Sequence, residues 1–137
     1  MQPDDVPVLA VLRQALAYHN DRQRVIAENV ANANTPGFTP RDIPRTEFER
    51  ALEGAQRVEP VSLTVSEPGH ISGREGARRE YTARRAPDTE TTINGNSVVL
   101  EEQMVRANEN RMRFETVLGL YQKSLALMRM ASSPPGR

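Results

Sequence analysis

Apolar side chains recur at alternating intervals of three and four residues along the first part of the chain. This spacing is that of a seam on one face of an α-helix that packs against a partner helix. No proline or glycine interrupts the chain between Pro7 and Pro36. The pattern therefore predicts one long helix over residues 8–33 within an N-terminal unit of residues 1–33. The seam consists of Leu9, Leu12, Leu16, His19, Gln23, Ile26, Val30 and Ala33.

The last part of the chain repeats the same spacing. The turn-forming pair Asn94-Gly95 precedes it, and the side chain of Asn96 or Ser97 can accept hydrogen bonds from the first free amides of a helix. Prolines after residue 132 end it. We expect a helix over residues 97–131 and a flexible tail over 132–137. Its seam is Leu100, Met104, Ala107, Arg111, Phe114, Leu118, Tyr121, Leu125 and Met128.

The end of this second helix carries more apolar surface than one partner helix needs. Nine of the fourteen residues 117–130 are apolar or aromatic, whereas one packing partner covers a stripe of about 100°. Apolar surface is then left for other copies or for partner helices. The alternative is that Ile43 and Phe48 cover it within the monomer. The predicted assembly interface is Leu9, Leu12, Leu16, Ile26, Val30, Met104, Phe114, Val117, Leu118, Leu120, Tyr121, Leu125, Leu127, Met128 and Met130.

The connecting region, residues 34–96, holds six prolines and six glycines, so only short elements are expected there. Alternation of apolar and polar positions predicts a strand at residues 61–65, which residues 80–82 could pair with. Residues 46–55 fit one or two helical turns. The predicted fold class is mainly α. Long N- and C-terminal helices form an antiparallel or coiled-coil-like pair, and the irregular polar middle carries short β elements.

Composition removes several classes of function. Eighteen basic and eighteen acidic residues give a formal charge of zero, whereas general nucleic-acid binders carry a basic excess. A cluster of arginines in residues 74–85 is either a solvated segment or a patch for an acidic partner. The second interpretation is the alternative function: a helical adaptor or regulator. The cluster consists of Arg74, Arg78, Arg79, Arg84 and Arg85.

No pattern of catalytic or metal-binding residues is present. The two histidines, His19 and His70, stand in different parts of the chain without a second ligand at metal-binding spacing. The chain has no cysteine and no nucleotide-binding or nucleophile motif. We expect no enzyme, no metal, no cofactor and no small-molecule substrate. The acidic start and the lack of a long apolar stretch also indicate that the sequence carries no classical cleavable export signal.

A sharp turn follows the first helix. Pro36 forces Thr35 out of the helical region, and the pair Pro36-Gly37 fits the centre of a type II turn, in which glycine supplies the positive φ. Asn32 and Asn34 can hydrogen-bond to the backbone at a helix end. Phe38 follows as a plausible anchor onto the helix. The run of turn-specific residues is Asn29, Ala31, Asn32, Asn34, Thr35, Pro36, Gly37 and Phe38.

This run resembles the N-terminal signature of bacterial flagellar rod and hook proteins. Two further stretches, residues 62–71 with Ser-Leu-Thr-Val and His-Ile, and residues 95–98 with Gly-Asn-Ser-Val, are similar to the proximal rod members of the basal-body rod family. Val99 stands where these members commonly have aspartate, so Glu101 and Glu102 take over the contact with the helix dipole.

The resemblance implies a structural subunit of the proximal rod. Such a subunit polymerises through its terminal helices into a hollow helical tube that transmits torque. The implied partners are other copies of the chain, FlgC-like and FlgF-like rod proteins, a FliE-like adaptor, the membrane ring and the flagellar type III export apparatus. The implied location is the rod of the basal body in the periplasmic space.

Overall fold

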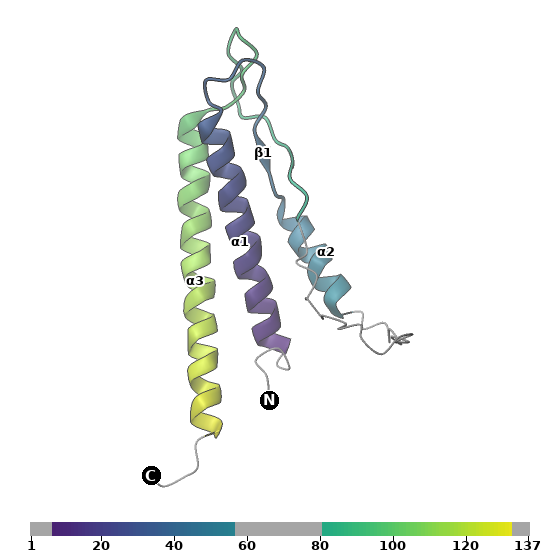
Figure 1. The fold of residues 1–137 in the computed structure, drawn as a ribbon, viewed down its shortest axis with the longest axis vertical. Helices are drawn as coiled ribbons and strands as arrows, with labels where there is room; N and C mark the ends of the chain where they lie inside the picture. The colour runs from purple at the N-terminus through teal and green to yellow at the C-terminus, as the bar shows by residue number, and fades with distance from the viewer. Residues whose placement is uncertain (1–6, 57–80, 133–137) are drawn as a thin grey trace, which may run out of the picture.

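The structure is a computed structural model that describes residues 7–56 and 81–132. Its elements are α1 (Pro7–Ala31), β1 (Arg41–Asp42), α2 (Arg45–Gln56), β2 (Arg84–Arg85) and α3 (Leu100–Ser132). The long helices α1 and α3 lie side by side and run in opposite directions, and α2 lies on the other side of α1 (Figure 1). The predicted fold class, a pair of long helices with short β elements between them, is confirmed.

A small apolar core fixes α2 and the β strands to α1. The buried residues Tyr18, Val25, Ile43 and Tyr81 form this core, and Phe48 packs against it. The rings of Tyr18 and Phe48 have centroids 5.3 Å apart. The alternative in which Ile43 and Phe48 cover the apolar surface of α3 is therefore wrong, because both pack on the side of α1 that carries the core.

The two strands form a single antiparallel pair, in which Arg41 faces Arg85 and Asp42 faces Arg84. The strand predicted at residues 61–65 lies outside the described residues. The prediction of a partner strand at residues 80–82 is wrong at the two positions that the structure describes, because neither Tyr81 nor Thr82 lies in a strand. Tyr81 is a core residue instead, and its hydroxyl donates a hydrogen bond to the Gln14 carbonyl oxygen at 3.1 Å. The helical turns predicted at residues 46–55 are confirmed as α2.

An ion pair connects β1 to α1. Arg22 donates two hydrogen bonds to the Asp42 carboxylate, from Nε at 2.8 Å and from Nη2 at 2.7 Å. The hydrogen bond with Asp42 raises the pKa of Arg22 above its usual value and outweighs the opposing effect of burial. Tyr18 adds a hydrogen bond from its hydroxyl to the Ile43 carbonyl oxygen at 2.9 Å. The chain therefore turns back onto α1 directly after β1.

Candidate assembly surface and the buried polar network

The lower half of the α1–α3 contact, away from the connecting loops, is apolar on both helices. Leu9 is 0% exposed, and Leu12 and Leu16 are half-buried. On α3, the residues that share the face toward α1 are half-buried. They are Phe114, Val117, Leu118, Tyr121, Leu125 and Met128. The structure thus brings the members of this set that lie opposite α1 together as the seam within one subunit.

The upper half of the same contact buries the predicted seam residue Ile26, which is 2% exposed, but is otherwise mainly polar. At Val30 and Met104 the predicted seam is wrong by one position. Val30 and Met104 are 37% and 54% exposed, whereas their neighbours Asn29 and Gln103 are buried. Hydropathy alone selects the apolar residue of each neighbouring pair. The structure buries the amide residue because it finds hydrogen-bond partners across the seam, which removes the cost of burying it.

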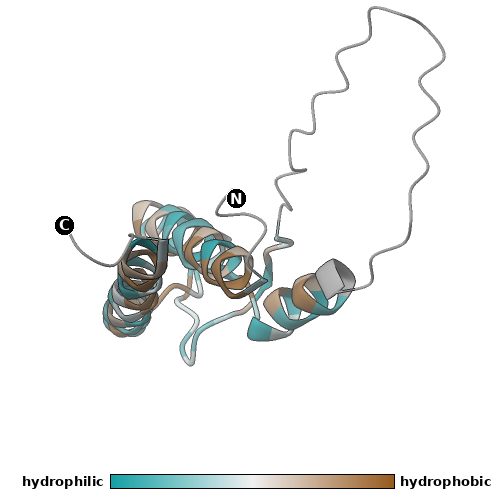
Figure 2. Ribbon diagram, turned by 90° about the horizontal axis from the view of Figure 1, so that it is seen from below, coloured by the Kyte–Doolittle hydropathy of each residue, from teal (hydrophilic) through white to brown (hydrophobic). Residues whose placement is uncertain are grey.

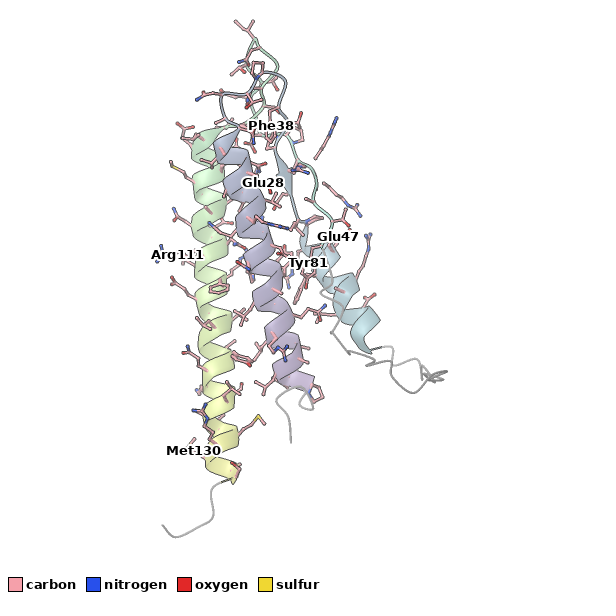
Figure 3. The ribbon with its side chains drawn as sticks, in the orientation of Figure 1. Glu28, Phe38, Glu47, Tyr81, Arg111 and Met130 are labelled. Carbon is pink, nitrogen blue, oxygen red and sulfur yellow. The ribbon has the colours of Figure 1, made fainter. Side chains whose placement is uncertain are left out.

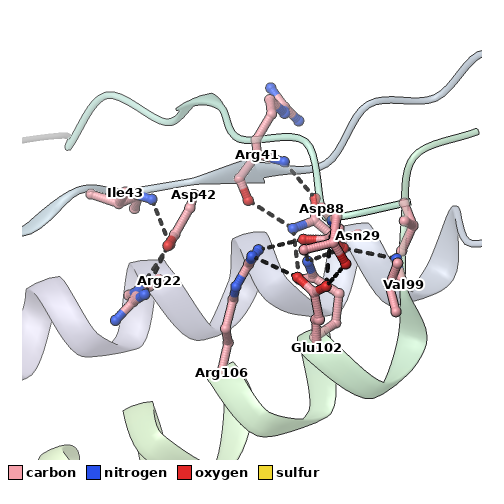
Figure 4. A network of polar contacts seen from close by, with 12 residues as sticks. Arg22, Asn29, Arg41, Asp42, Ile43, Asp88, Val99, Glu102 and Arg106 are labelled. Carbon is pink, nitrogen blue, oxygen red and sulfur yellow. Dashed lines mark hydrogen bonds and ion pairs between the residues drawn. The ribbon is translucent and has the colours of Figure 1, made fainter. Parts of the chain in front are cut away.

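Asn29 is the centre of a buried network that joins α1, α3 and β1 (Figure 4). Its side chain pairs with both backbone groups of Arg41: Oδ1 accepts from the amide at 2.9 Å and Nδ2 donates to the carbonyl oxygen at 2.7 Å. Nδ2 also donates to Oε1 of Gln103 at 3.0 Å. Asn29 thus pairs with both backbone groups of Arg41 in β1, as a residue of a neighbouring strand would.

Asp88 continues the network at the start of α3. Its carboxylate accepts two hydrogen bonds from Nε2 of Gln103, at 3.1 and 2.9 Å, and one from the Val99 amide at 2.8 Å. Arg106 forms an ion pair with it at 2.7 Å. The side chain of Asp88 is fully buried. Asp88 therefore caps the start of α3, although it lies eleven residues before Val99 in the sequence. Asn96 is a second cap, because its side-chain oxygen accepts from the Val98 amide at 2.8 Å.

A second polar layer crosses the seam near its middle. Nδ1 of His19 lies 2.8 Å from Oδ1 of Asn110, and Nδ2 of Asn110 donates to the His19 carbonyl oxygen at 2.8 Å and to the Gln23 side chain at 3.0 Å. Burial lowers the pKa of His19, partly opposed by the hydrogen bond to Asn110, and Arg22 and Arg113 lower it further. His19 is therefore a packed seam residue in its neutral form.

Acidification should weaken the helix pair through His19. Its pKa in the folded chain lies below the usual value of 6.5, so the unfolded chain binds more protons between these two values. The stabilisation is present above about pH 6.5 and is lost as the pH falls toward the folded pKa. We expect the melting temperature to fall between pH 7.5 and 5.5, measured by circular dichroism. A His19→Gln variant should show a smaller fall, and an equal fall would contradict the assignment.

The turn after α1 interlocks with the loop before α3. The Phe38 amide donates to the Thr35 carbonyl oxygen at 3.2 Å, and Gly37 has a φ of 69°, as a type II turn requires. Nδ2 of Asn96 donates to the Asn32 and Thr35 carbonyl oxygens at 2.9 and 2.6 Å. Asn96 therefore supplies hydrogen bonds to carbonyl oxygens that follow the end of α1.

The residues of the turn fall into a half-buried set and an exposed set. Asn32 bonds back to α1, from Nδ2 to the Glu28 carbonyl oxygen at 2.8 Å, and Phe38 is half-buried beside the loop (Figure 3). The remaining members point to the surface. These are Ala31, Asn34, Thr35, Pro36 and Gly37.

Large apolar side chains lie exposed along the remaining faces of α3. Among the described residues, only Gln103 and Asn110 of this helix are buried. Figure 2 shows brown, apolar positions around the long helices rather than on one side only. Met130 lies at the free end of α3 in Figure 3. The exposed set is Leu100 at 38%, Met104 at 54%, Val105 at 57%, Met112 at 68%, Leu120 at 51%, Leu127 at 54% and Met130 at 64%.

Comparisons with known proteins identify the class. A family model described as flagella basal body rod protein matches residues 9–39, which hold most of α1 and its turn. The flagellar basal body rod protein FlgB of Proteus mirabilis is 35% identical over 98 residues, 70% of this chain and 69% of the relative. FlgB of Agrobacterium fabrum is 31% identical over 134 residues, 95% of this chain and 94% of the relative. The chain belongs to the family of flagellar basal body rod proteins.

Membership of the rod protein family decides between the functions predicted from the sequence. The chain is a structural subunit of the flagellar basal body rod and not an enzyme. The adaptor alternative gains no support. Arg74, Arg78 and Arg79 lie outside the described residues, and Arg84 of β2 forms an ion pair with Glu47 of α2 at 2.6 Å.

Membrane-spanning helices and metal-binding clusters are both absent from the described residues of this rod protein. No described helix is long and apolar enough to cross a membrane. No group of three or more histidine or acidic side chains in residues 7–56 and 81–132 is arranged to hold a metal ion.

Substitution of Gly37 should damage this family's turn through the backbone alone. A Cβ at Gly37 would meet no atom within 4 Å, so its φ of 69° is the only obstacle. For a β-branched residue this conformation costs about 1–2 kcal/mol. We expect Gly37→Val to lower the free energy of unfolding by that amount in urea titrations and to impair rod formation. Gly37→Asn, which tolerates positive φ, should lose clearly less. Equal losses would show that the turn does not need this φ.

Proposed function

We propose that this rod protein is a subunit of the proximal rod and polymerises through α1 and α3 into a hollow helical tube that transmits torque. The exposed apolar surface of α3 carries the proposal. It is spread along a helix of 33 residues, which is roughly 50 Å long at about 1.5 Å per residue. Each large apolar side chain that a neighbour fully buries contributes about 1.5–3 kcal/mol.

On this proposal, the residues of the predicted interface have two different roles. Side chains of the seam, such as Ile26 and Phe114, hold the helix pair of one subunit together. Side chains that stay exposed, such as Leu120 and Leu127, contact neighbouring subunits. Repetition of one such contact between different faces builds an open helical tube and not a closed dimer. Many parallel contacts make that tube stiff enough for torque.

The proposed neighbours follow from the same rod. They are further copies of the chain, FlgC-like and FlgF-like rod proteins, a FliE-like adaptor and the membrane ring. On this proposal the rod crosses the periplasmic space, and the chain reaches it through the type III export apparatus without cleavage of a signal peptide.

Deletion of the gene with complementation tests the proposal. Cells without the chain should lack rods in electron micrographs of purified basal bodies and should not swim, and the wild-type gene should restore both. Purified basal bodies from the complemented strain should contain the chain with its N-terminus uncleaved, as shown by mass spectrometry. Intact rods in the deletion strain would contradict the proposed function.

A further inference from the structure

The loop at residues 92–95 presents one apolar side chain from a firmly held backbone. The side chain of Ile93 is 109% exposed. The Thr92 amide donates to the Asn96 carbonyl oxygen and the Gly95 amide to the Thr92 carbonyl oxygen, both at 2.8 Å. The Gly37 amide donates to the Asn94 carbonyl oxygen at 3.0 Å. The loop is thus held by backbone hydrogen bonds on both sides of Ile93, and it keeps this side chain in water, where the side chain adds nothing to the stability of the subunit.

The opposite end of the subunit carries a second apolar feature. The connection between β2 and α3 lies at one end of the long axis, and the last turns of α3 lie at the other, beyond the start of α1 (Figure 1). Leu127 and Met130 in these turns are 54% and 64% exposed. The two apolar features therefore lie where successive subunits in a stack would meet.

The charges at the two ends are complementary. Residues 86–102, around the loop, hold no basic residue, and Glu90 and Glu101 are exposed there, whereas the other two acidic residues, Asp88 and Glu102, form ion pairs with Arg106. Residues 119–132 of α3 include two basic residues, Lys123 and Arg129, and no acidic residue. Opposite charges beside an apolar contact favour one end of a subunit meeting the other end of its neighbour and disfavour contact between like ends.

We propose that residues 92–95 form an axial docking knob, which binds the apolar and basic C-terminal helix end of the next rod subunit. The partner has the chemistry that α3 of this chain itself presents at its free end. The inference rests on the proposed function, since it requires the chain to assemble in a rod. It adds residues 92–95 to the assembly surface and names them as the partner of the free end of α3.

Ile93→Asp separates this contact from folding and from the α3 surface. The side chain is fully exposed, so the variant should melt within about 1 °C of wild type, consistent with the small effects of surface changes. Swimming and rod yield should fall at least tenfold. Thr91→Asp is the matched control, because it adds the same charge at an exposed position of the same connection. Normal rods from Ile93→Asp would overturn the docking knob. They would leave the proposed function standing if Leu120→Asp still abolishes rods.

A photo-crosslinking amino acid at position 93 identifies the occupant in motile cells. The expected product joins position 93 to the C-terminal helix end of another rod subunit, identified by mass spectrometry of the peptides. A crosslink to any other segment or protein, or no crosslink in cells that swim, would overturn the inference. If the chain is absent from rods altogether, the proposed function fails and the docking knob fails with it.

Discussion

Replacing Leu127 with aspartate should abolish rod assembly and swimming without unfolding the subunit. Leu127 is 54% exposed in the isolated chain, so a carboxylate there stays in water and costs the monomer little. At an interface between subunits the same carboxylate would be buried without a partner, at a cost of several kcal/mol per contact. Because every subunit repeats the contact, the loss multiplies along the tube. Electron microscopy of basal bodies and swimming assays measure the result.

Gln122→Asp serves as the control for Leu127→Asp. Gln122 is exposed on the same helix, and its replacement adds the same charge without removing an apolar side chain. We expect rods from this variant and none from Leu127→Asp or Leu120→Asp, while all three are exported and have the helix content of wild type. Motile cells that carry Leu127→Asp would place the subunit interface elsewhere on the molecule.

The elements that sequence periodicity predicts well are those whose cause is local. Uninterrupted apolar spacing and the proline-glycine turn place both long helices within a few residues of their observed ends: α1 ends at Ala31 and α3 begins at Leu100. The later start of α3 than residue 97 follows from capping. Asn96 and Asp88 accept the amides that precede the first turn, and Asp88 is too distant in sequence for a local rule to find.

Long-range polar pairing is what the sequence does not reveal. Gln103 and Asn110 look like surface residues of α3, and partners outside this helix explain their burial. Gln103 pairs with Asn29 and Asp88, and Asn110 pairs with His19 and Gln23. Asn29 belongs to the recognised turn signature, but its role as a clamp on the Arg41 backbone depends on where β1 lies. The predicted apolar seam has polar residues, His19 and Gln23, at two successive seam positions. This pair is the signal in the sequence that indicates a polar layer.

Replacing Asn29 should be the most destabilising single change within the subunit. Asn29→Ala leaves the amide and carbonyl of Arg41 and the side-chain oxygen of Gln103 without their partner. Each group that loses its hydrogen bond in a buried setting costs roughly 1–3 kcal/mol. Since water reaches part of β1, we expect a total loss of about 2–4 kcal/mol in the free energy of unfolding, measured by urea titration. Asn34→Ala, at an exposed position three residues after the end of α1, should change it by less than about 0.5 kcal/mol.

Asn29→Asp distinguishes hydrogen bonding from packing at this position. Aspartate has nearly the same shape, so a role in packing alone predicts little loss. It still accepts from the Arg41 amide, but its second oxygen faces the Arg41 carbonyl and Oε1 of Gln103, which are both acceptors. Rotation of the Gln103 amide would supply a donor but would turn its oxygen toward the Asp88 carboxylate. We therefore expect a loss close to that of Asn29→Ala, and near-wild-type stability would show that the network contributes shape and not hydrogen bonds.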